Sequence, residues 1–117
     1  MGAADYLDLQ QARRDWIGRM SYRLESFDAV LSPTVPIVAP VVADLAPGDC
    51  RNQAFFDVNA QLLRNTSAVN MLDGCALSLP CHERGELPVG LMVWHGPMHD
   101  DAVLNISLQI ETQLGTD

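Results

Sequence analysis

Two uninterrupted apolar runs near the C-terminal end most constrain how this 117-residue chain can fold. Apart from Ser78, the segments Cys75–Leu79 and Val89–Trp94 hold only small or apolar residues, without the alternation of a half-exposed strand. Such runs are typical of strands covered on both faces. The segment Glu83–Glu86 between them is polar and contains glycine, so we expect the runs to pair as a β-hairpin. Helices above and below must then cover the sheet.

The segment Tyr6–Phe27 is predicted to be an amphipathic helix. Its apolar residues recur at helical spacing and form one stripe, made of Leu9, Trp16, Met20, Leu24 and Phe27. The opposite side is charged, and Asp15 and Arg19 stand at the i,i+4 spacing of a helical ion pair. We interpret this side as a solvated face.

A short buried strand is expected over Ala29–Leu31, stopped by Pro33. Further prolines follow at Pro36, Pro40 and Pro47. Because proline disfavours helix at its own position and at the residue before it, the connection up to Gly48 is predicted to be extended rather than helical.

A second helix is predicted over Gln53–Arg64, capped by Asp49 or Asn52. The polar residues Asn65–Ser67 then indicate a break and a new cap, followed by a short helical turn over Ala68–Leu72. This turn should end at Asp73-Gly74, with glycine in the positive-φ position that terminates a helix.

The last helix is expected to be capped by Asp100 or Asp101 and to bury a stripe of Val103, Ile106, Ile110 and Leu114. The pattern as a whole predicts one α/β domain over residues 1–117. Its centre is a small mixed sheet of about three strands with flanking helices. Two long helices and a short one are too few to cover both faces of such a sheet, so some of the covering is missing from this chain.

Charge and composition limit the partners of this chain. Fifteen acidic residues, seven arginines and no lysine give a net charge of -8, which excludes an extended cationic surface for nucleic acid. No apolar run approaches the roughly 20 residues that span a bilayer. These features predict a soluble cytoplasmic protein without nucleic-acid or membrane partners.

The three cysteines, Cys50, Cys75 and Cys81, are expected to be reduced thiols. Along a strand, Cys75 and Cys81 would lie about 20 Å apart, far beyond the ~7 Å limit for a disulfide. A metal site made of Cys81, His82, His95 and His99 is geometrically possible, but its spacing matches none of the usual metal motifs. We predict neither a metal nor a cofactor.

Two blocks of sequence resemble the C-terminal portion of amidase signature hydrolases. The first is NTSAVNMLDGCALSLPCHERGELPVG (Asn65–Gly90), which is similar to a Thr-led helix with Asn, a strand ending Ser-x-Pro and a Gly-Leu-Pro-Val-Gly-Leu hairpin. The second is DAVLSPTVPIVAP (Asp28–Pro40), which resembles the strand and proline loop of the same family. One departure stands out, because Asp73 and Cys75 occupy positions where many members have Gly and Pro. This departure leaves the substrate class open.

The resemblance implies a fold and a mechanism. Complete members carry a large mixed sheet, and they cleave amides with a serine activated through a cis-peptide serine by a lysine, all three in the N-terminal part. This chain has no lysine and no Gly-Ser-rich segment, so it holds none of the catalytic residues. By resemblance, Thr34 and Pro36 in the proline loop and Thr66 and Asn70 on the helix should approach the substrate pocket. The alternative is that Thr66 and Asn70 only cap the helix and hold it in place.

Independent catalysis by this chain is not expected. Ser78 falls within a predicted buried strand, where its hydroxyl should bond to backbone, and not on the exposed sharp turn of a serine nucleophile. Neighbouring side chains on a strand point to opposite faces, which disfavours a Cys81-His82 pair. His95 and His99 are interpreted as ordinary, partly exposed imidazoles in a loop.

Two functions are therefore compatible with the sequence. The first is the C-terminal part of an amidase whose complete form cleaves carbon-nitrogen amide bonds and whose catalytic portion is its partner. The alternative is a noncatalytic interaction or assembly module with the amidase fold. In both cases the uncovered apolar strands predict that the chain by itself is not a monomer, with a two-fold dimer as the simplest outcome.

Overall fold

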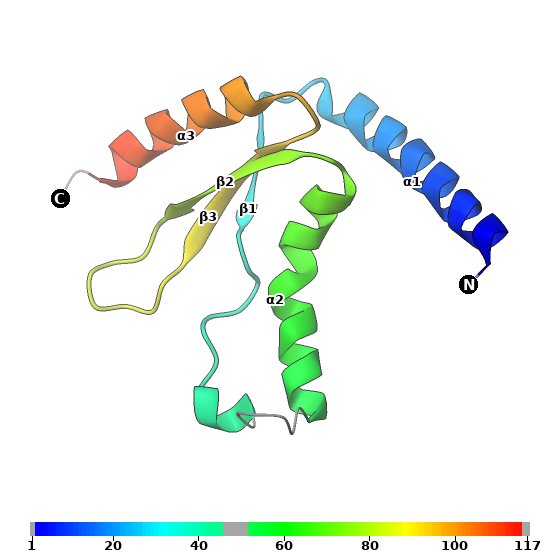
Figure 1. Cartoon of the computed structure of the whole chain (residues 1–117). Helices are drawn as coiled ribbons and strands as arrows, with labels where there is room; N and C mark the ends of the chain where they lie inside the picture. The colour runs from blue at the N-terminus through cyan, green and yellow to red at the C-terminus, as the bar shows by residue number, and fades with distance from the viewer. Residues whose placement is uncertain (1, 46–51, 116–117) are drawn as a thin grey trace.

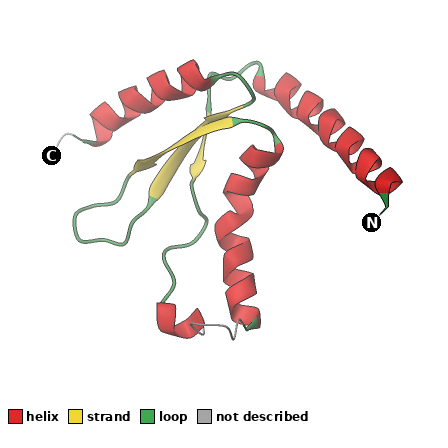
Figure 2. Cartoon of the chain, in the orientation of Figure 1, coloured by secondary structure: helices red, strands yellow, loops and turns green. Residues whose placement is uncertain are grey.

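The computed structural model describes residues 2–45 and 52–115 of the chain. Three α-helices, one short 3-10 helix and three strands are found in this part (Figure 1). In chain order they are α1 (Ala3–Leu24), β1 (Val30–Pro33), the 3-10 helix η1 (Val42–Leu45), α2 (Gln53–Met71), β2 (Cys75–Pro80), β3 (Gly90–His95) and α3 (Asp100–Leu114). The strands form the centre of the fold and the helices lie around them (Figure 2).

The three strands form one sheet in the order β1-β3-β2. The hairpin predicted from the two apolar runs is confirmed, because β2 and β3 pair antiparallel with Leu77 opposite Val93. The strand β1 pairs antiparallel with the other side of β3, with Leu31 opposite Val93. Three strands with flanking helices were expected and are found, but the sheet was predicted to be mixed, whereas all the pairing in the described part of the chain is antiparallel.

The core lies between this sheet and α3. Leu79, Val93 and Val103 form its buried cluster, and Ile106 and Ile110 of α3 pack against it. The predicted stripe of α3 is therefore confirmed at these positions, while Leu114 at the end of the stripe is exposed.

The N-cap of α3 was predicted at the wrong residue. The cap is His99, with no side-chain cap bond, and Asp100 and Asp101 lie in the first turn. There their carboxylates face the positive end of the helix dipole, which is favourable without a capping hydrogen bond.

Coverage of the sheet differs between strands. In the central strand β3, the neighbours Met92 and Val93 point to opposite faces and both are buried. This confirms covering on both sides at the middle of the predicted run, while Val89 at its start is exposed and lies outside β3. In β2 the prediction is wrong for this chain alone, because Ala76 and Ser78 on one face are exposed. Helix α3 packs against the other face of β2, with Leu77 and Leu79, so the face of Ala76 and Ser78 stays exposed.

The chain is flat and open (Figure 1). Its principal extents are 51 × 44 × 16 Å and its radius of gyration is 17.6 Å, whereas a compact domain of this length has a radius near ~13 Å. The solvent-accessible surface is 8634 Å², against ~6,300 Å² for a compact monomer of 12.8 kDa. The chain thus exposes about 2,300 Å² more surface than a self-contained domain would.

The second helix differs from its prediction in continuity. Asn52 caps it as expected, since its side-chain oxygen accepts from the Phe55 amide at 3.0 Å. The predicted break at Asn65–Ser67 does not occur, and α2 runs unbroken to Met71. Polar residues can continue a helix when tertiary contacts use their side chains, and Asn65 makes such a contact. The alternative cap, Asp49, lies outside the described residues.

The turn after α2 assigns Asp73 and Gly74 roles other than those predicted. Asp73, not Gly74, has the positive φ of 54°. A β-carbon on Gly74 would lie 2.4 Å from the backbone oxygen of His95, so glycine is needed here for close approach of two strands. Asp73 tolerates the left-handed conformation better than most residues do.

The first helix covers little of the sheet. It begins and ends close to its predicted bounds, but of its apolar stripe only Leu24 is buried, and Leu9 and Phe27 are exposed. The predicted Asp15–Arg19 pair is replaced, because Asp15 accepts from the Gln11 amide at 2.8 Å. The stripe is thus present in the helix, but the described part of the chain offers no surface that buries it.

The connection after β1 contains one helical element that was not predicted. The strand extends through Pro33, and η1 interrupts the expected extended segment. A single 3-10 turn fits between Pro40 and Pro47 because no proline falls inside it. The predictions for Pro47, Gly48 and Cys50 lie outside the described residues.

Candidate functional site

Two hydroxyl groups from separate strands meet on one face of the sheet. Thr34 directly follows β1, and Ser78 lies in β2, yet their Oγ1 and Oγ atoms are 2.5 Å apart across the central strand. The backbone amide of Thr34 donates to the Gly90 carbonyl at 2.8 Å, which fixes the position of Thr34. Each hydroxyl carries one hydrogen, and their mutual bond uses one of the two. The pair therefore keeps one hydrogen that it can donate to another group.

Gly90 makes this hydroxyl pair possible. A β-carbon at position 90 would lie 2.6 Å from Ser78 Oγ and 2.7 Å from Thr34 Oγ1. The predicted environment of Ser78 is wrong, because its side chain is exposed and its partner is a side chain rather than backbone. A glycine within a strand pattern signals close approach of another group, and that signal at Gly90 could have located the pair in the sequence.

An apolar hollow of about 210 Å³ adjoins the hydroxyl pair. Its lining comes from the proline loop and the start of β3, namely Pro33, Val35, Pro36, Ile37, Val38, Pro88, Val89 and Gly90. Gly90 belongs to the hollow and also contacts both hydroxyls. Binding sites for small molecules typically combine an apolar cavity with a few polar groups that orient the ligand. Neither Thr34 nor Ser78 lines the hollow, so the hydroxyl pair and the hollow are neighbours that share Gly90.

Of the four residues predicted to approach the substrate pocket, Pro36 lines the hollow, and Thr34 lies next to Gly90 without being part of the lining. Thr66 lies on α2, and its hydroxyl bonds to the Leu63 carbonyl at 3.3 Å. The residue before it, Asn65, donates to the Pro33 carbonyl at 2.8 Å and so ties α2 to the end of β1. Thr66 is thus one residue from this link, and neither Thr66 nor Asn70 lines the hollow.

Asn70 lies at the C-terminal end of α2, where Arg13 of α1 docks. The Arg13 guanidinium donates to the Asn70 carbonyl at 3.3 Å and to the Met71 carbonyl at 3.1 Å, and it forms an ion pair with Asp73 at 2.5 Å. A cation at the negative end of a helix dipole is favourable, but the partly exposed pair contributes no more than about 1 kcal/mol. Here Asn70 acts through its backbone.

The two C-terminal histidines form a stacked pair that the sequence did not predict. His95 belongs to β3 and is 3% exposed, which corrects its interpretation as a loop imidazole, whereas His99 is exposed. Their ring centroids are 3.8 Å apart. His95 Nδ1 accepts from the Gly96 amide at 2.7 Å, so Nε2 carries the hydrogen and donates to the Phe27 carbonyl at 3.1 Å. His95 thereby ties β3 to the end of the α1–β1 connection.

The cysteines are separate from one another. Cys75 and Cys81 are free thiols, and the Cys81 thiol and the His82 ring both contact backbone of Val89. Over residues 2–45 and 52–115, no three acidic, histidine or cysteine side chains are grouped so that they could hold a metal ion. In the same residues no helix is both long and apolar enough to cross a membrane.

Comparison with known proteins decides the family. Residues 1–104 match the sequence profile of the family described as Amidase. This chain belongs to the amidase family. A crystal structure of an amidase has the same fold, with a TM-score of 0.69 at 24% identity over 98% of this chain and 26% of that chain. The predicted membership of the amidase family and the predicted α/β fold class are thus confirmed.

Two curated amidase relatives give a measure of coverage. The chain is 30% identical over 92 residues to the 2-amino-5-chloromuconic acid deaminase of Comamonas testosteroni, which covers 78% of this chain and 19% of that protein. It is 31% identical over 114 residues to the fatty acid amide hydrolase of Arabidopsis thaliana, and this match covers 93% of this chain and 18% of that protein. The chain therefore spans about a fifth of the length of these relatives.

Proposed function

We propose that this chain supplies the C-terminal portion of an amidase signature hydrolase whose complete form cleaves carbon-nitrogen amide bonds. The observation that carries the proposal is the surface of the chain, about 2,300 Å² larger than that of a compact monomer. Each partner in an ordinary protein interface buries about 800 Å². The excess is therefore large enough for several such contacts, as expected for part of a larger fold.

In this proposal the remainder of the enzyme supplies the catalytic residues and this chain supplies part of the substrate pocket. The resemblance assigns the nucleophilic serine, the cis-peptide serine and the activating lysine to the remainder of the enzyme. This chain supplies one wall of the substrate pocket, with Thr34 and Pro36 in direct contact with substrate and Thr66 and Asn70 nearby on α2. The hydrogen left free by the Thr34–Ser78 pair then donates to a polar group of the substrate while the apolar hollow holds its body.

Two buried polar atoms without partners support the proposal that this chain is part of a larger fold. Ser32 Oγ in β1 and Trp94 Nε1 in β3 are buried without a hydrogen-bond partner, and the paired register places both side chains on the face of Ser78. Buried polar groups in complete folds are nearly always paired.

We also propose that the assembled enzyme works in the cytoplasm. The free thiols of Cys75 and Cys81 support a reducing compartment.

The DNA around the coding sequence provides the test. We expect an upstream segment, in the same reading frame or a neighbouring one, that encodes a lysine followed by a Gly-Ser-rich stretch. The protein assembled from both segments should hydrolyse simple amides, and replacing that lysine by alanine should lower kcat by at least about 100-fold. Gly18→Ala in α1 serves as the control, since among residues 2–45 and 52–115 no atom outside the helix lies within 4 Å of its added methyl group.

Two results would contradict the proposal. One is an upstream region without the catalytic segment, together with a stable symmetric oligomer of the 117-residue chain. This result would favour the alternative, a noncatalytic assembly module. The other is amidase activity of the purified 117-residue chain.

A further inference from the structure

The two outer edges of the sheet differ in their free hydrogen-bonding groups. In the β2–β3 ladder the Cys81 amide donates to the Val89 carbonyl, so alternation places the backbone groups of Leu79, Leu77 and Cys75 toward β3. The amides and carbonyls of the residues between them, Ala76 and Ser78, therefore point outward. Because β2 is the edge strand, no other strand of the described chain pairs with them.

The edge of β1, by contrast, is blocked at Pro33. The Thr34 amide donates to the Gly90 carbonyl, so the backbone amides and carbonyls of the even-numbered residues of β1 point toward β3. Those of the odd-numbered residues, Leu31 and Pro33, point outward. Pro33 has no amide hydrogen to offer, and its outward carbonyl already accepts from the Asn65 side chain at 2.8 Å. Proline on an outer strand is a common way of preventing further pairing.

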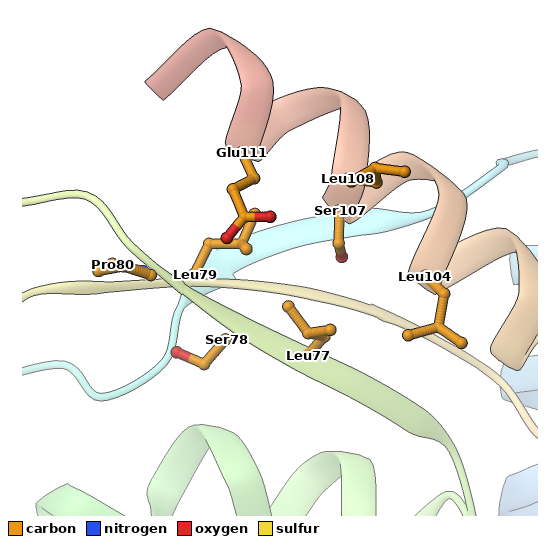
Figure 3. Close-up of a pocket in the computed structure, with 8 residues that line it drawn as sticks. All are labelled: Leu77, Ser78, Leu79, Pro80, Leu104, Ser107, Leu108 and Glu111. Atoms are coloured by element: carbon orange, nitrogen blue, oxygen red, sulfur yellow. The ribbon is translucent and has the colours of Figure 1, made fainter. Parts of the chain in front are cut away.

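A groove runs along the open edge of β2, between the strand and α3. It consists of three adjoining hollows of about 280, 480 and 320 Å³, which share Leu77 and Leu104 at one junction and Leu79, Pro80 and Glu111 at the other. The central hollow is drawn in Figure 3. Its walls are apolar, with Leu77 and Leu79 on the strand side and the exposed Leu104 and Leu108 on the helix side.

The polar groups of the groove indicate what it binds. Ser107 is 2% exposed, its hydroxyl has no partner, and it points from α3 toward β2 (Figure 3). Carboxylates stand at the two ends, Asp100 beside the start of β2 and Glu111 beside its end. A buried hydroxyl without a partner costs about 1–3 kcal/mol, so a ligand that pairs with it gains specificity.

We infer that this groove holds an extended strand from the remainder of the amidase fold. The strand pairs with the outward groups of Ala76 and Ser78 and presents apolar side chains to Leu104 and Leu108. It carries a hydrogen-bonding side chain opposite Ser107 and basic residues near Asp100 and Glu111. A second copy of this chain fits less well, because its net charge is -8 and its own acids would meet those of the groove. The inference rests on the proposed function and adds the position at which the two portions join.

Hydrogen exchange of the 117-residue chain tests this inference. The probe is a synthetic peptide of about six alternating valines and threonines flanked by arginines, since a strand of that length spans about 20 Å. We expect saturating peptide to slow exchange of the Ala76 and Ser78 amides about tenfold, with the Leu31 amide on the β1 edge unaffected. Replacing the flanking arginines by glutamates should weaken binding about tenfold.

Two pairs of variants separate loss of binding from loss of folding, because each pair makes the same substitution inside and outside the groove. Ala76→Pro removes an outward amide and should abolish binding, whereas Leu31→Pro makes the equivalent change on the β1 edge and should not. Leu108→Arg places a cation in the groove wall and should also abolish binding. Its control is Leu7→Arg on α1, because Leu7 and Leu108 are similarly exposed, at 65% and 62%.

Three outcomes would overturn the inference. The first is equal binding by Ala76→Pro and Leu31→Pro, and the second is a preference for the glutamate-flanked peptide. The third is a dimer of the unliganded chain that only Ala76→Pro dissociates, since the occupant would then be a second copy. Because none of these measurements uses activity, the inference can stand even if the upstream DNA shows that the proposed amidase function is wrong.

Discussion

Replacing Gly74 by alanine tests whether close approach, rather than backbone conformation, fixes glycine between α2 and β2. The new β-carbon would lie 2.4 Å from the His95 carbonyl oxygen and 3.2 Å from Val69 Cγ1. The oxygen is backbone in the central strand, directly opposite Cys75 in the register, so it cannot rotate away as a side chain could. The end of the β2–β3 ladder must separate to admit the methyl group.

The expected cost follows from two opposing terms. Overpacking of a closely packed site costs about 1–3 kcal/mol. Alanine also lowers the conformational entropy of the unfolded chain, which raises the free energy of unfolding by about 0.4–1 kcal/mol. The net loss in free energy of unfolding therefore lies between about 0 and 2.6 kcal/mol, with a central value of about 1.3 kcal/mol. With a urea dependence of about 1–2 kcal/mol per molar, the unfolding midpoint should fall by roughly 1 M.

Urea unfolding followed by far-UV circular dichroism provides the measurement, with Gly18→Ala as the matched control. Gly18 lies within α1, and no atom outside the helix comes within 4 Å of its added methyl group. Alanine is the better helix former by about 1 kcal/mol, so this variant should raise the midpoint. The two substitutions are chemically identical and should shift stability in opposite directions. If both raise it, the packing argument for Gly74 is wrong.

Three further predictions concern activity and assembly. The purified 117-residue chain should not hydrolyse aliphatic or aromatic amides; turnover that Ser78→Ala abolishes would contradict this. In the assembled enzyme, Asn70→Ala should lower kcat/KM about tenfold with little change in thermal stability; lost stability with unchanged kcat/KM would show that Asn70 only holds α2 in place. Without its covering portion, the chain should self-associate at micromolar concentration through exposed apolar surface, equally in Ala76→Pro and Leu31→Pro. Light scattering over a dilution series checks this, and a monodisperse monomer that binds no hydrophobic dye would refute it.

The sequence alone determined the family, the order of the three strands and the long helices, and the central hairpin. The apolar runs around Leu77 and Val93 and the stripe of α3 are local periodicities, and such patterns survive without knowledge of the neighbours. The cap at Asn52 and the shortage of covering layers were also predictable, the latter because two apolar strands need more helical surface than this chain has.

Only the tertiary structure decided the candidate site and the roles of single residues. The Thr34–Ser78 pair joins residues 44 positions apart, and it forms because Gly90 in the strand between them has no side chain. Likewise, Asp73 takes the positive φ while Gly74 admits a neighbouring strand, although the dipeptide alone favours the reverse. The open edge of β2 and the edge of β1 that Pro33 blocks depend on strand order and on which amides each ladder uses. The common reason is that these features arise from contacts distant in sequence, whereas periodicity and capping are fixed within a few residues.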